Sequence, residues 1–213
     1  MCIRDRPITH APFVKCSALS ARGSLDDFGT VFSLSPLGWV GGYVFIYLML
    51  GKARVLFDCW HGPPDSPAAL AWDVIREEGC YNGGLMPYML PKILEQKDSR
   101  KTWKMRSLMV AGQPIKRDTV SQALLLSEVV VVSYPSTELI TVTCAPVTDA
   151  SSYEDYNVGV PCPALPCNTV KICDGRGQEV ARGSKGEVYA KTAYMAREYL
   201  NCLLYTSDAA DES

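Results

Sequence analysis

Runs of apolar residues alternate with polar, turn-forming segments along this chain. The run at residues 30–35 predicts a strand that Pro36 ends, and residues 53–57 predict a second strand. Between them, residues 37–50 are almost wholly apolar and predict a helix that Gly51 closes. A strand, a helix and another strand in succession are typical of an α/β layer.

Further helices follow from the same kind of pattern. Ser66 is placed to cap a helix that has Pro67 at its first position and stops at Gly79. Residues 89–96 predict another helix, and residues 116–126 predict a third. The helical pattern therefore continues well past the first layer.

The last of these helices stands between two predicted strands, at residues 107–110 and 128–133. The second strand is continuously apolar, as expected when both faces of a sheet are covered. From 7 to 157 the chain thus predicts an α/β region with a mixed sheet flanked by helices. From 158 to 201 prolines and glycines become frequent and the predicted strands are short, which indicates a small β-rich subdomain.

The two ends of the chain share an unusual relationship. The first five residues can be encoded by DNA whose reverse complement, in another frame, encodes residues 202–206. Such an inverted repeat is typical of a translated sequencing adapter. We therefore interpret residues 1–6 and 202–213 as adapter-derived and exclude them from fold reasoning. The remaining segment, 7–201, is interpreted as truncated at both ends.

The composition of the chain limits the classes of partner that it is expected to bind. The chain is 47% hydrophobic and 21% charged with a net charge of −2, so it offers no electrostatic basis for binding nucleic acid or an anionic membrane. Apart from Cys2 and Cys202, its cysteines form no C-x-x-C pair, and there are two histidines. We expect no zinc site, and reduced thiols in an intracellular protein, with cytoplasm, mitochondrion and peroxisome all open.

The apolar segment at residues 37–50 raises the question of a membrane. It is shorter than the roughly 20 residues that cross a bilayer, and it follows Pro36 and contains three glycines. A buried helix is favoured and no transmembrane span is expected, with a true span kept as the alternative.

Candidate chemistry gathers at residues 129–138, where a buried strand runs into the polar sequence Tyr-Pro-Ser-Thr-Glu. In open α/β sheets, ligands bind just outside the carboxyl ends of strands. The ring of Tyr134 can stack on a base, the hydroxyl of Thr137 can hold a phosphate oxygen, and Glu138 can ligate magnesium. An ordinary strand-ending turn has the same composition, so the residues alone leave both interpretations open.

Residues 134–138 resemble the Y-G-x-T-E motif of the adenylate-forming superfamily, which includes acyl-CoA synthetases, luciferases and peptide-synthetase adenylation domains. Residues 36–42 are similar to the family's P-L-F-H-x-x-G segment, which lines the acyl pocket. Residues 110–115 are similar to its G-G-x-P-L turn beside the adenylate. Residues 158–177 and 183–201 resemble the V-G-x-P-x-P…D-x-x-G and G-E-x-G-E…G-Y-x-N stretches, so five segments match in order.

The resemblance implies part of the large N-terminal domain of an adenylate-forming enzyme. It also implies a two-step ligase, most similar to acyl-CoA synthetases. A fatty or aromatic carboxylate would attack the α-phosphate of ATP, giving an acyl-adenylate and pyrophosphate. The thiolate of coenzyme A would then displace AMP, with Mg²⁺ as the metal cofactor.

The family's functional residues map onto this chain by position. Thr137 and Glu138 would be catalytic, with Thr137 on the phosphate and Glu138 on Mg²⁺. Tyr134 would stack on adenine, and Ser136 would also contact the nucleotide.

Two other segments complete the expected site. Gly112, Gln113 and Pro114 would shape the wall beside the adenylate. Trp39 and Gly41 would line the acyl pocket.

Several positions depart from the family pattern. Pro135 replaces the motif glycine, which removes a backbone donor and fixes φ near −65°. Gly38 and Trp39 replace a phenylalanine–histidine pair. The family's phosphate loop, expected before Thr9, its ribose-binding aspartate, expected after Asn201, and its C-terminal lysine are not in the sequence. We therefore expect the chain as given to be inactive; acid-dependent release of pyrophosphate would contradict this.

Two alternatives to the acyl-CoA synthetase remain at this stage. One is a luciferase-like or peptide-synthetase adenylation enzyme. The other is a non-catalytic member that keeps the fold as a binding module, which Pro135 favours. Outside the motifs, Glu154 and Asp155 form an acidic pair that we expect to be a solvated surface.

Overall fold

In the computed structural model of the chain, the structure is described for residues 29–35, 51–57, 67–96, 103–157, 160–161 and 169–191. Strands and helices alternate through most of this part, followed by strands alone. The elements, in chain order, are β1 Thr30–Ser33, β2 Arg54–Val55, α3 Pro67–Glu77, β3 Cys80–Leu85, α4 Met89–Gln96, β4 Met105–Val110, α5 Arg117–Leu124, β5 Ser127–Ser136, β6 Ile140–Val147, the 3₁₀ helix η2 Ala150–Ser152, β7 Val160–Pro161, β8 Thr169–Cys173 and β9 Glu187–Lys191.

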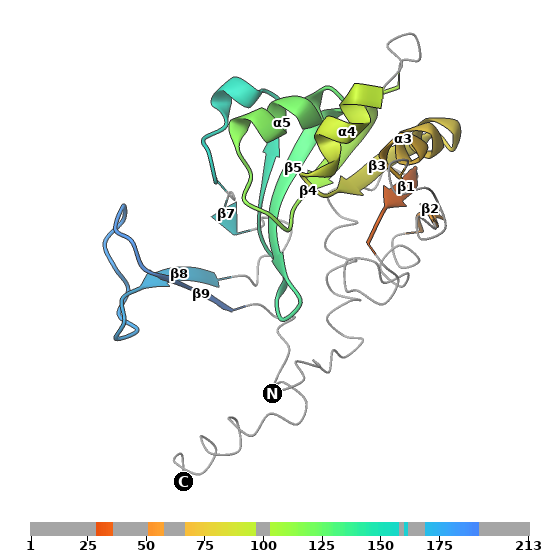
Figure 1. Ribbon diagram of the computed structural model, residues 1–213. Coiled ribbons are helices and arrows are strands. Elements are labelled where there is room, and N and C mark those ends of the chain that lie inside the picture. Colours follow the sequence, from red (N-terminus) through yellow and green to blue (C-terminus); the bar gives the residue numbers. More distant parts are fainter. Residues whose placement is uncertain are drawn as a thin grey trace.

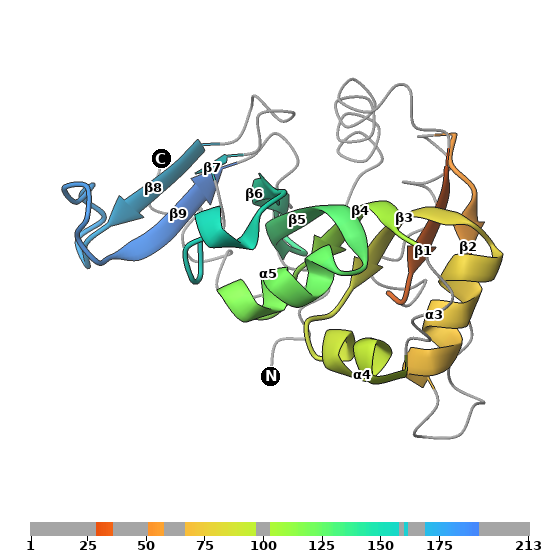
Figure 2. The same ribbon diagram turned by 90° about the horizontal axis from the view of Figure 1, so that it is seen from above.

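One seven-stranded sheet organises the α/β part of the molecule. Its strands lie in the order β2-β1-β3-β4-β5-β6-β7 (Figure 1). The first five of these run parallel, β6 runs antiparallel to β5, and β7 runs antiparallel to β6. Helices α3, α4 and α5 lie side by side along one face of the sheet (Figure 2). The predicted mixed sheet flanked by helices is confirmed.

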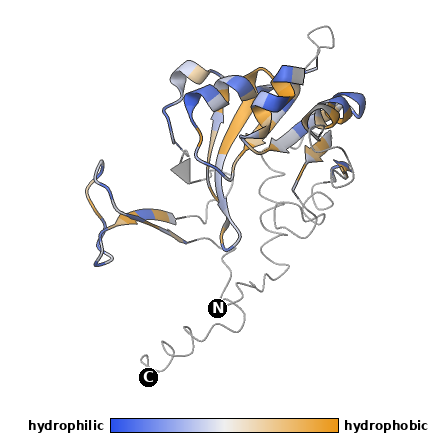
Figure 3. Ribbon diagram, in the orientation of Figure 1, coloured by the Kyte–Doolittle hydropathy of each residue, from blue (hydrophilic) through white to orange (hydrophobic). Residues whose placement is uncertain are grey.

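The core lies between this sheet face and the three helices. Strand residues that face the helices are fully buried, and Figure 3 shows β4 and β5 as the most apolar strands beneath them. These strand residues meet apolar side chains from each helix. Helices α3 and α4 bury one face each, and α5 buries Val120 and Ala123. The fully buried members of this core include Phe32, Ile75, Leu90, Ile93, Leu108, Val110, Val130 and Val132.

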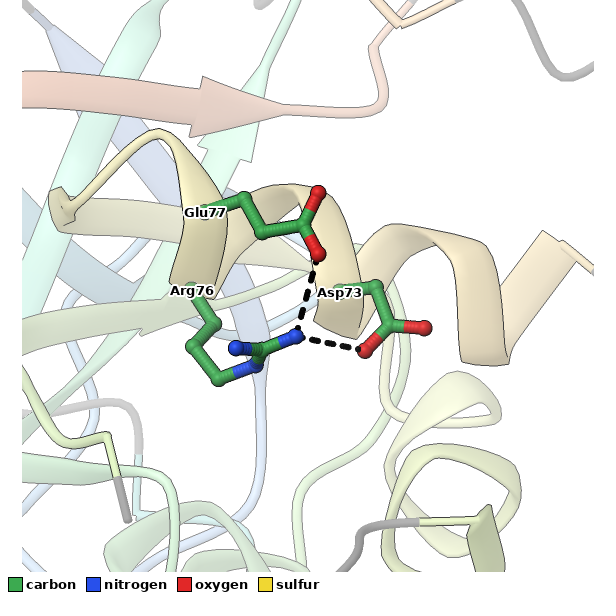
Figure 4. A network of polar contacts seen from close by, with 3 residues as sticks. All are labelled: Asp73, Arg76 and Glu77. Carbon is green, nitrogen blue, oxygen red and sulfur yellow. Dashed lines mark hydrogen bonds and ion pairs between the residues drawn. The ribbon is translucent and has the colours of Figure 1, made fainter. Parts of the chain in front are cut away.

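The outer surface of α3 carries a small ionic network. One guanidinium nitrogen of Arg76 lies 3.2 Å from a carboxylate oxygen of Asp73 and 3.1 Å from one of Glu77 (Figure 4). Both acids are more than half exposed. Exposed pairs of this kind contribute at most about 1 kcal/mol, so the packing of the buried face is what holds α3.

The predicted helices at residues 66–79 and 89–96 are confirmed as α3 and α4. Gly79 ends the first with a φ of +57°, a conformation that favours glycine. The helix expected at residues 116–126 is shorter, because α5 ends at Leu124. The strand expected at residues 53–57 is reduced to the two residues of β2.

Two strands had not been predicted. Strand β3 contains Asn82, Gly83 and Gly84, which are poor strand formers. Strand β6 forms a hairpin with β5, so the polar residues 134–136 continue the strand instead of starting a loop.

The β-rich character expected after residue 157 appears as an antiparallel pair. Strands β8 and β9 form their own two-stranded sheet, with Thr169 opposite Lys191 and Cys173 opposite Glu187. It stands apart from the seven-stranded sheet (Figure 1).

The apolar segment at residues 37–50 lies outside the described residues, and so does its expected helix. Among the helices that the structure does describe, none has the length and apolar character needed to cross a bilayer.

Neighbouring residues of β4 offer a direct test of this core. Leu108 is fully buried beneath the helices, whereas Met109, on the opposite face, is 45% exposed. We expect Leu108→Ala to lower the free energy of unfolding by about 2–5 kcal/mol, since it removes apolar contacts and leaves a cavity. Met109→Ala should lower it by about 0.5 kcal/mol. Urea titration followed by circular dichroism measures both, and equal losses would contradict the placement of the core.

Candidate functional site

The carboxyl ends of three parallel strands meet at one edge of the sheet. Leu85, the last residue of β3, is in register with Val110, the last residue of β4, and Val110 is in register with Val132 of β5. The segments that follow these residues therefore start side by side. In α/β sheets this edge is where ligands bind.

The segment after β4 is a tight, exposed turn. Gly112 has a φ of +86°, in the region that L-residues with a side chain avoid. A Cβ at this position would lie 3.3 Å from the Sδ atom of Met86, so the backbone of the turn packs closely on the segment after β3. Gln113 and Pro114, which complete the predicted wall, are exposed.

Tyr134 is related to this turn by the register of the sheet. Gly112 is two residues beyond Val110, and Tyr134 is two residues beyond the partner of Val110 in β5. The side chain of Tyr134 is 43% exposed, which leaves part of its ring open for contact. Two of the predicted segments therefore follow paired residues of neighbouring strands.

Strand β5 extends past the end of β4 and turns back into β6 (Figure 1). Thr137 and Glu138 lie in that turn, and both are half-buried. Thr137 is three residues beyond Tyr134, roughly 10 Å along an extended chain. The predicted acid and hydroxyl therefore stand farther out along the hairpin than Tyr134 and the Gly112 turn.

Ser136 has a structural contact in this hairpin. Its Oγ accepts a hydrogen bond of 3.1 Å from the backbone N–H of Leu139. The bond closes the turn that carries Thr137 and Glu138, because a serine side chain can take the place of a backbone acceptor. The hydroxyl hydrogen of Ser136 is left to donate to another group.

Pro135 lies where the pairing of β5 with β6 shifts register. The shift falls between Tyr134, opposite Thr143, and Pro135, opposite Thr141. A residue without a backbone N–H is tolerated in a strand at such an irregularity. The replacement of the motif glycine is therefore accommodated locally, and β5 continues through it to Ser136.

Cys80 does not add a nucleophile to this edge. Cys80 is fully buried at the amino end of β3, and burial, with a smaller effect of Glu78, raises the pKa of its thiol to about 11. At pH 7 only about 1 in 10,000 such thiols is ionised. Cys144 lies opposite Ser133 on β6, and Cys173 ends β8.

Two predicted site residues lie outside the described part of the chain. Trp39 and Gly41 belong to the unplaced segment at residues 36–50, so the acyl-pocket assignment stays a prediction. Conversely, Met86 was not a candidate, although it packs against Gly112. Its position depends on the pairing of β3 with β4, and β3 had not been predicted.

The strain at Gly112 can be measured. We expect Gly112→Ala to lower the free energy of unfolding by about 1–2 kcal/mol, because a side chain disfavours this φ and meets Met86. Gly175→Ala is the matched control, since its added Cβ meets nothing within 4 Å. The control should be neutral or stabilising by up to about 1 kcal/mol. Equal urea midpoints for the two variants would contradict the strained turn.

Solved structures with this fold were found over nearly the whole chain. O-succinylbenzoate coenzyme A synthetase from Bacillus subtilis, in complex with AMP, matches with a TM-score of 0.76 and 18% identity over 96% of this chain and 40% of its own. A benzoate CoA ligase from Burkholderia xenovorans matches with a TM-score of 0.76 and 20% identity over 95% of this chain and 41% of its own. The luciferase-like enzyme of the mealworm Zophobas morio matches with a TM-score of 0.72 and 16% identity over 92% and 47%.

At these identities the structural matches establish the fold, and the chain spans less than half the length of each of these three proteins. No match was found among curated proteins. The family model described as AMP-binding enzyme matches residues 7–200, nearly all of the sequence. The chain belongs to the AMP-binding enzyme family, the adenylate-forming superfamily, and forms part of that superfamily's large N-terminal domain.

Proposed function

We propose that the protein to which this chain belongs is an ATP-dependent, AMP-forming acyl-CoA synthetase. It joins a fatty or aromatic carboxylic acid to AMP and transfers the acyl group to coenzyme A. The observation that supports this most is the register of the sheet, in which the segments that carry Gly112 and Tyr134 follow the paired residues Val110 and Val132. The proposal concerns the whole protein, because the chain spans only part of its structural relatives.

The order of groups along the hairpin suits a nucleotide. The half-exposed ring of Tyr134 offers a surface on which adenine can stack, next to the glycine turn. Thr137 and Glu138 lie farther out. The phosphates of a nucleotide are likewise separated from its base by the ribose, so one molecule can reach both groups.

The residues of the hairpin turn fit a magnesium ion by their chemistry. Mg²⁺ binds oxygen ligands, usually one or two carboxylates together with phosphate oxygens. Glu138 supplies a carboxylate and Thr137 a hydroxyl, and both are half-buried at a turn that Ser136 fixes. Bound there, the ion would neutralise the negative charge that develops on the phosphate oxygens.

The chain's own residues have separate tasks in this proposal. Tyr134 and the Gly112 turn hold the base and the adenylate, and the Thr137 hydroxyl donates to a phosphate oxygen. Glu138 carries the metal. Fixed donors around the reacting phosphate cost little reorganisation in the transition state, which is the main source of catalysis expected here.

Support for coenzyme A as acceptor comes from the matched structures. One of them is described as a benzoate CoA ligase, and another is a CoA synthetase bound to a product analogue. The same fold also occurs in an amide bond synthetase and a luciferase-like enzyme, so the acceptor needs its own test. The sequence departure at Pro135 is the feature that favours a non-catalytic member instead.

The experiment that separates these functions uses the complete coding sequence of the protein. We expect acid-dependent release of pyrophosphate and, with coenzyme A present, of AMP, when a panel of fatty and aromatic acids is supplied. Turnover with amines in place of coenzyme A would indicate an amide synthetase. Absence of acid-dependent pyrophosphate release across the panel would contradict the enzyme and favour the binding module.

Exchanging single acids tests the role of Glu138. We expect Glu138→Gln to lower kcat for adenylate formation about 100- to 1000-fold, because the transition-state charge loses its metal. Glu128→Gln is the matched control: Glu128 is an exposed acid at the amino end of β5, the strand that leads into the turn with Glu138. A Glu138 variant as active as the control would refute the metal-binding role.

A further inference from the structure

The loop that follows β6 folds back onto the end of the Gly112 turn. The backbone N–H of Tyr156 donates to the carbonyl of Ile115 at 2.8 Å, and the hydroxyl of Tyr153 donates to the same carbonyl at 3.4 Å. In return, the guanidinium Nε of Arg117 donates to the carbonyl of Tyr153 at 2.9 Å. These contacts join residues 36 to 41 positions apart in sequence.

Helix α5 begins directly after this turn and lacks a cap of its own. Lys116 stands at the N-cap position and makes no side-chain cap hydrogen bond. Instead, the Oδ1 atom of Asp155 accepts from the backbone N–H of Arg117 at 2.7 Å. A carboxylate at a helix amino end is stabilised by the peptide dipoles as well as by the hydrogen bond. Glu154 and Asp155 are both exposed, as expected for a solvated surface, and Asp155 in addition caps α5.

The turn is consequently fixed at both ends and exposed in the middle. Val110 is fully buried before it and Ile115 is 3% exposed after it, whereas Gly112, Gln113 and Pro114 are exposed. Exposed backbone with few contacts of its own takes its position from its anchors. The carbonyl of Ile115 is one such anchor, and the loop at residues 153–156 holds it.

The loop at residues 153–156 is itself held firmly. The ring of Tyr153 is 2% exposed and belongs to the main core. Burial raises the pKa of its hydroxyl, with Asp155 adding to the effect, so the group stays protonated and able to donate. The preceding 3₁₀ helix η2 is capped by Asp149, whose carboxylate accepts from the N–H of Ser151.

We propose that Asp155 and Tyr153 are positioning residues for the nucleotide. By their hydrogen bonds to Ile115 and Arg117, which we call the latch, they keep the Gly112 turn at the distance from Tyr134 that nucleotide binding requires. The inference rests on the proposed function, since it concerns the same site. The connection is direct, because β6 pairs with the strand that carries Tyr134 and then leads into the latch. The β5–β6 hairpin, which carries Tyr134, thus also leads into the loop that holds the end of the Gly112 turn. A turn that is correctly placed only part of the time binds its ligand more weakly in proportion.

The test compares four variants of the full-length protein: Asp155→Ala, Asp155→Asn, Tyr153→Phe and Glu154→Ala. Glu154→Ala is the matched control, as an exposed acid of the same loop. Amide hydrogen exchange of residues 111–117 reports the latch. The Kd for AMP, measured by calorimetry well below the melting temperature of every variant, reports the site.

We expect Asp155→Ala to speed exchange in the turn about 2- to 30-fold, the range given by losing a helix cap. The Kd for AMP should rise by up to the same factor. Asp155→Asn keeps an acceptor oxygen, so the exchange rate of the turn and the Kd for AMP should both stay close to those of the unaltered protein. Tyr153→Phe, which keeps the buried ring, should give a smaller change of the same kind and carries the test if Asp155→Ala does not fold. Glu154→Ala should change neither quantity.

The outcomes separate the latch from the function. Faster exchange with an unchanged Kd for AMP would show a purely structural cap and overturn the inference. Equal effects of Asp155→Ala and Glu154→Ala would also overturn the inference, because the change in net charge alone would then explain them. If the unaltered protein binds no AMP while the exchange response persists, the proposed function fails, and the positioning role fails with it, although the latch itself remains.

Discussion

The parallel pairing of β3, β4 and β5 is the constraint on which the rest of the structure depends. Because Leu85, Val110 and Val132 lie in one register, the three following segments begin at the same edge of the sheet. A shift of one residue would turn the buried valines of β5 toward the other face, so burial against the helices enforces the register. The position of the site is thus set by core packing several residues away from it.

Two features extend this constraint to the exposed edge itself. The β5–β6 hairpin carries Tyr134 and Glu138 beyond the end of β4. The register shift at Pro135 accommodates a residue that has no backbone N–H to donate. The loop after β6 then returns to hold Ile115 and the first turn of α5. The two walls of the candidate site therefore belong to one continuous stretch of chain from β4 to residue 157.

Among the described elements, local patterns in the sequence were sufficient for α3 and α4 and, apart from its ends, for α5. The caps and stops of α3, at Pro67 and Gly79, could be recognised because they act within a few residues. Strand β3 could not, since it contains poor strand formers and the packing of one of them, Gly83, is long-range: a Cβ on Gly83 would lie 2.8 Å from the Sδ of Met105 on the next strand. The capping role of Asp155 could not be predicted for a similar reason, because its partner lies 38 residues away and no pattern near it indicates a cap.

The family fixes the chemistry broadly, and the edge formed by the Gly112 turn and Tyr134 is where the account places the nucleotide. Photolabelling with 8-azido-ATP followed by peptide mapping tests that placement most directly, because the reactive group sits on the base. The account predicts labels within residues 110–116 and 133–138, competed away by AMP. Labels confined to the outer faces of α3 and α4, or to the β8–β9 pair, would contradict it.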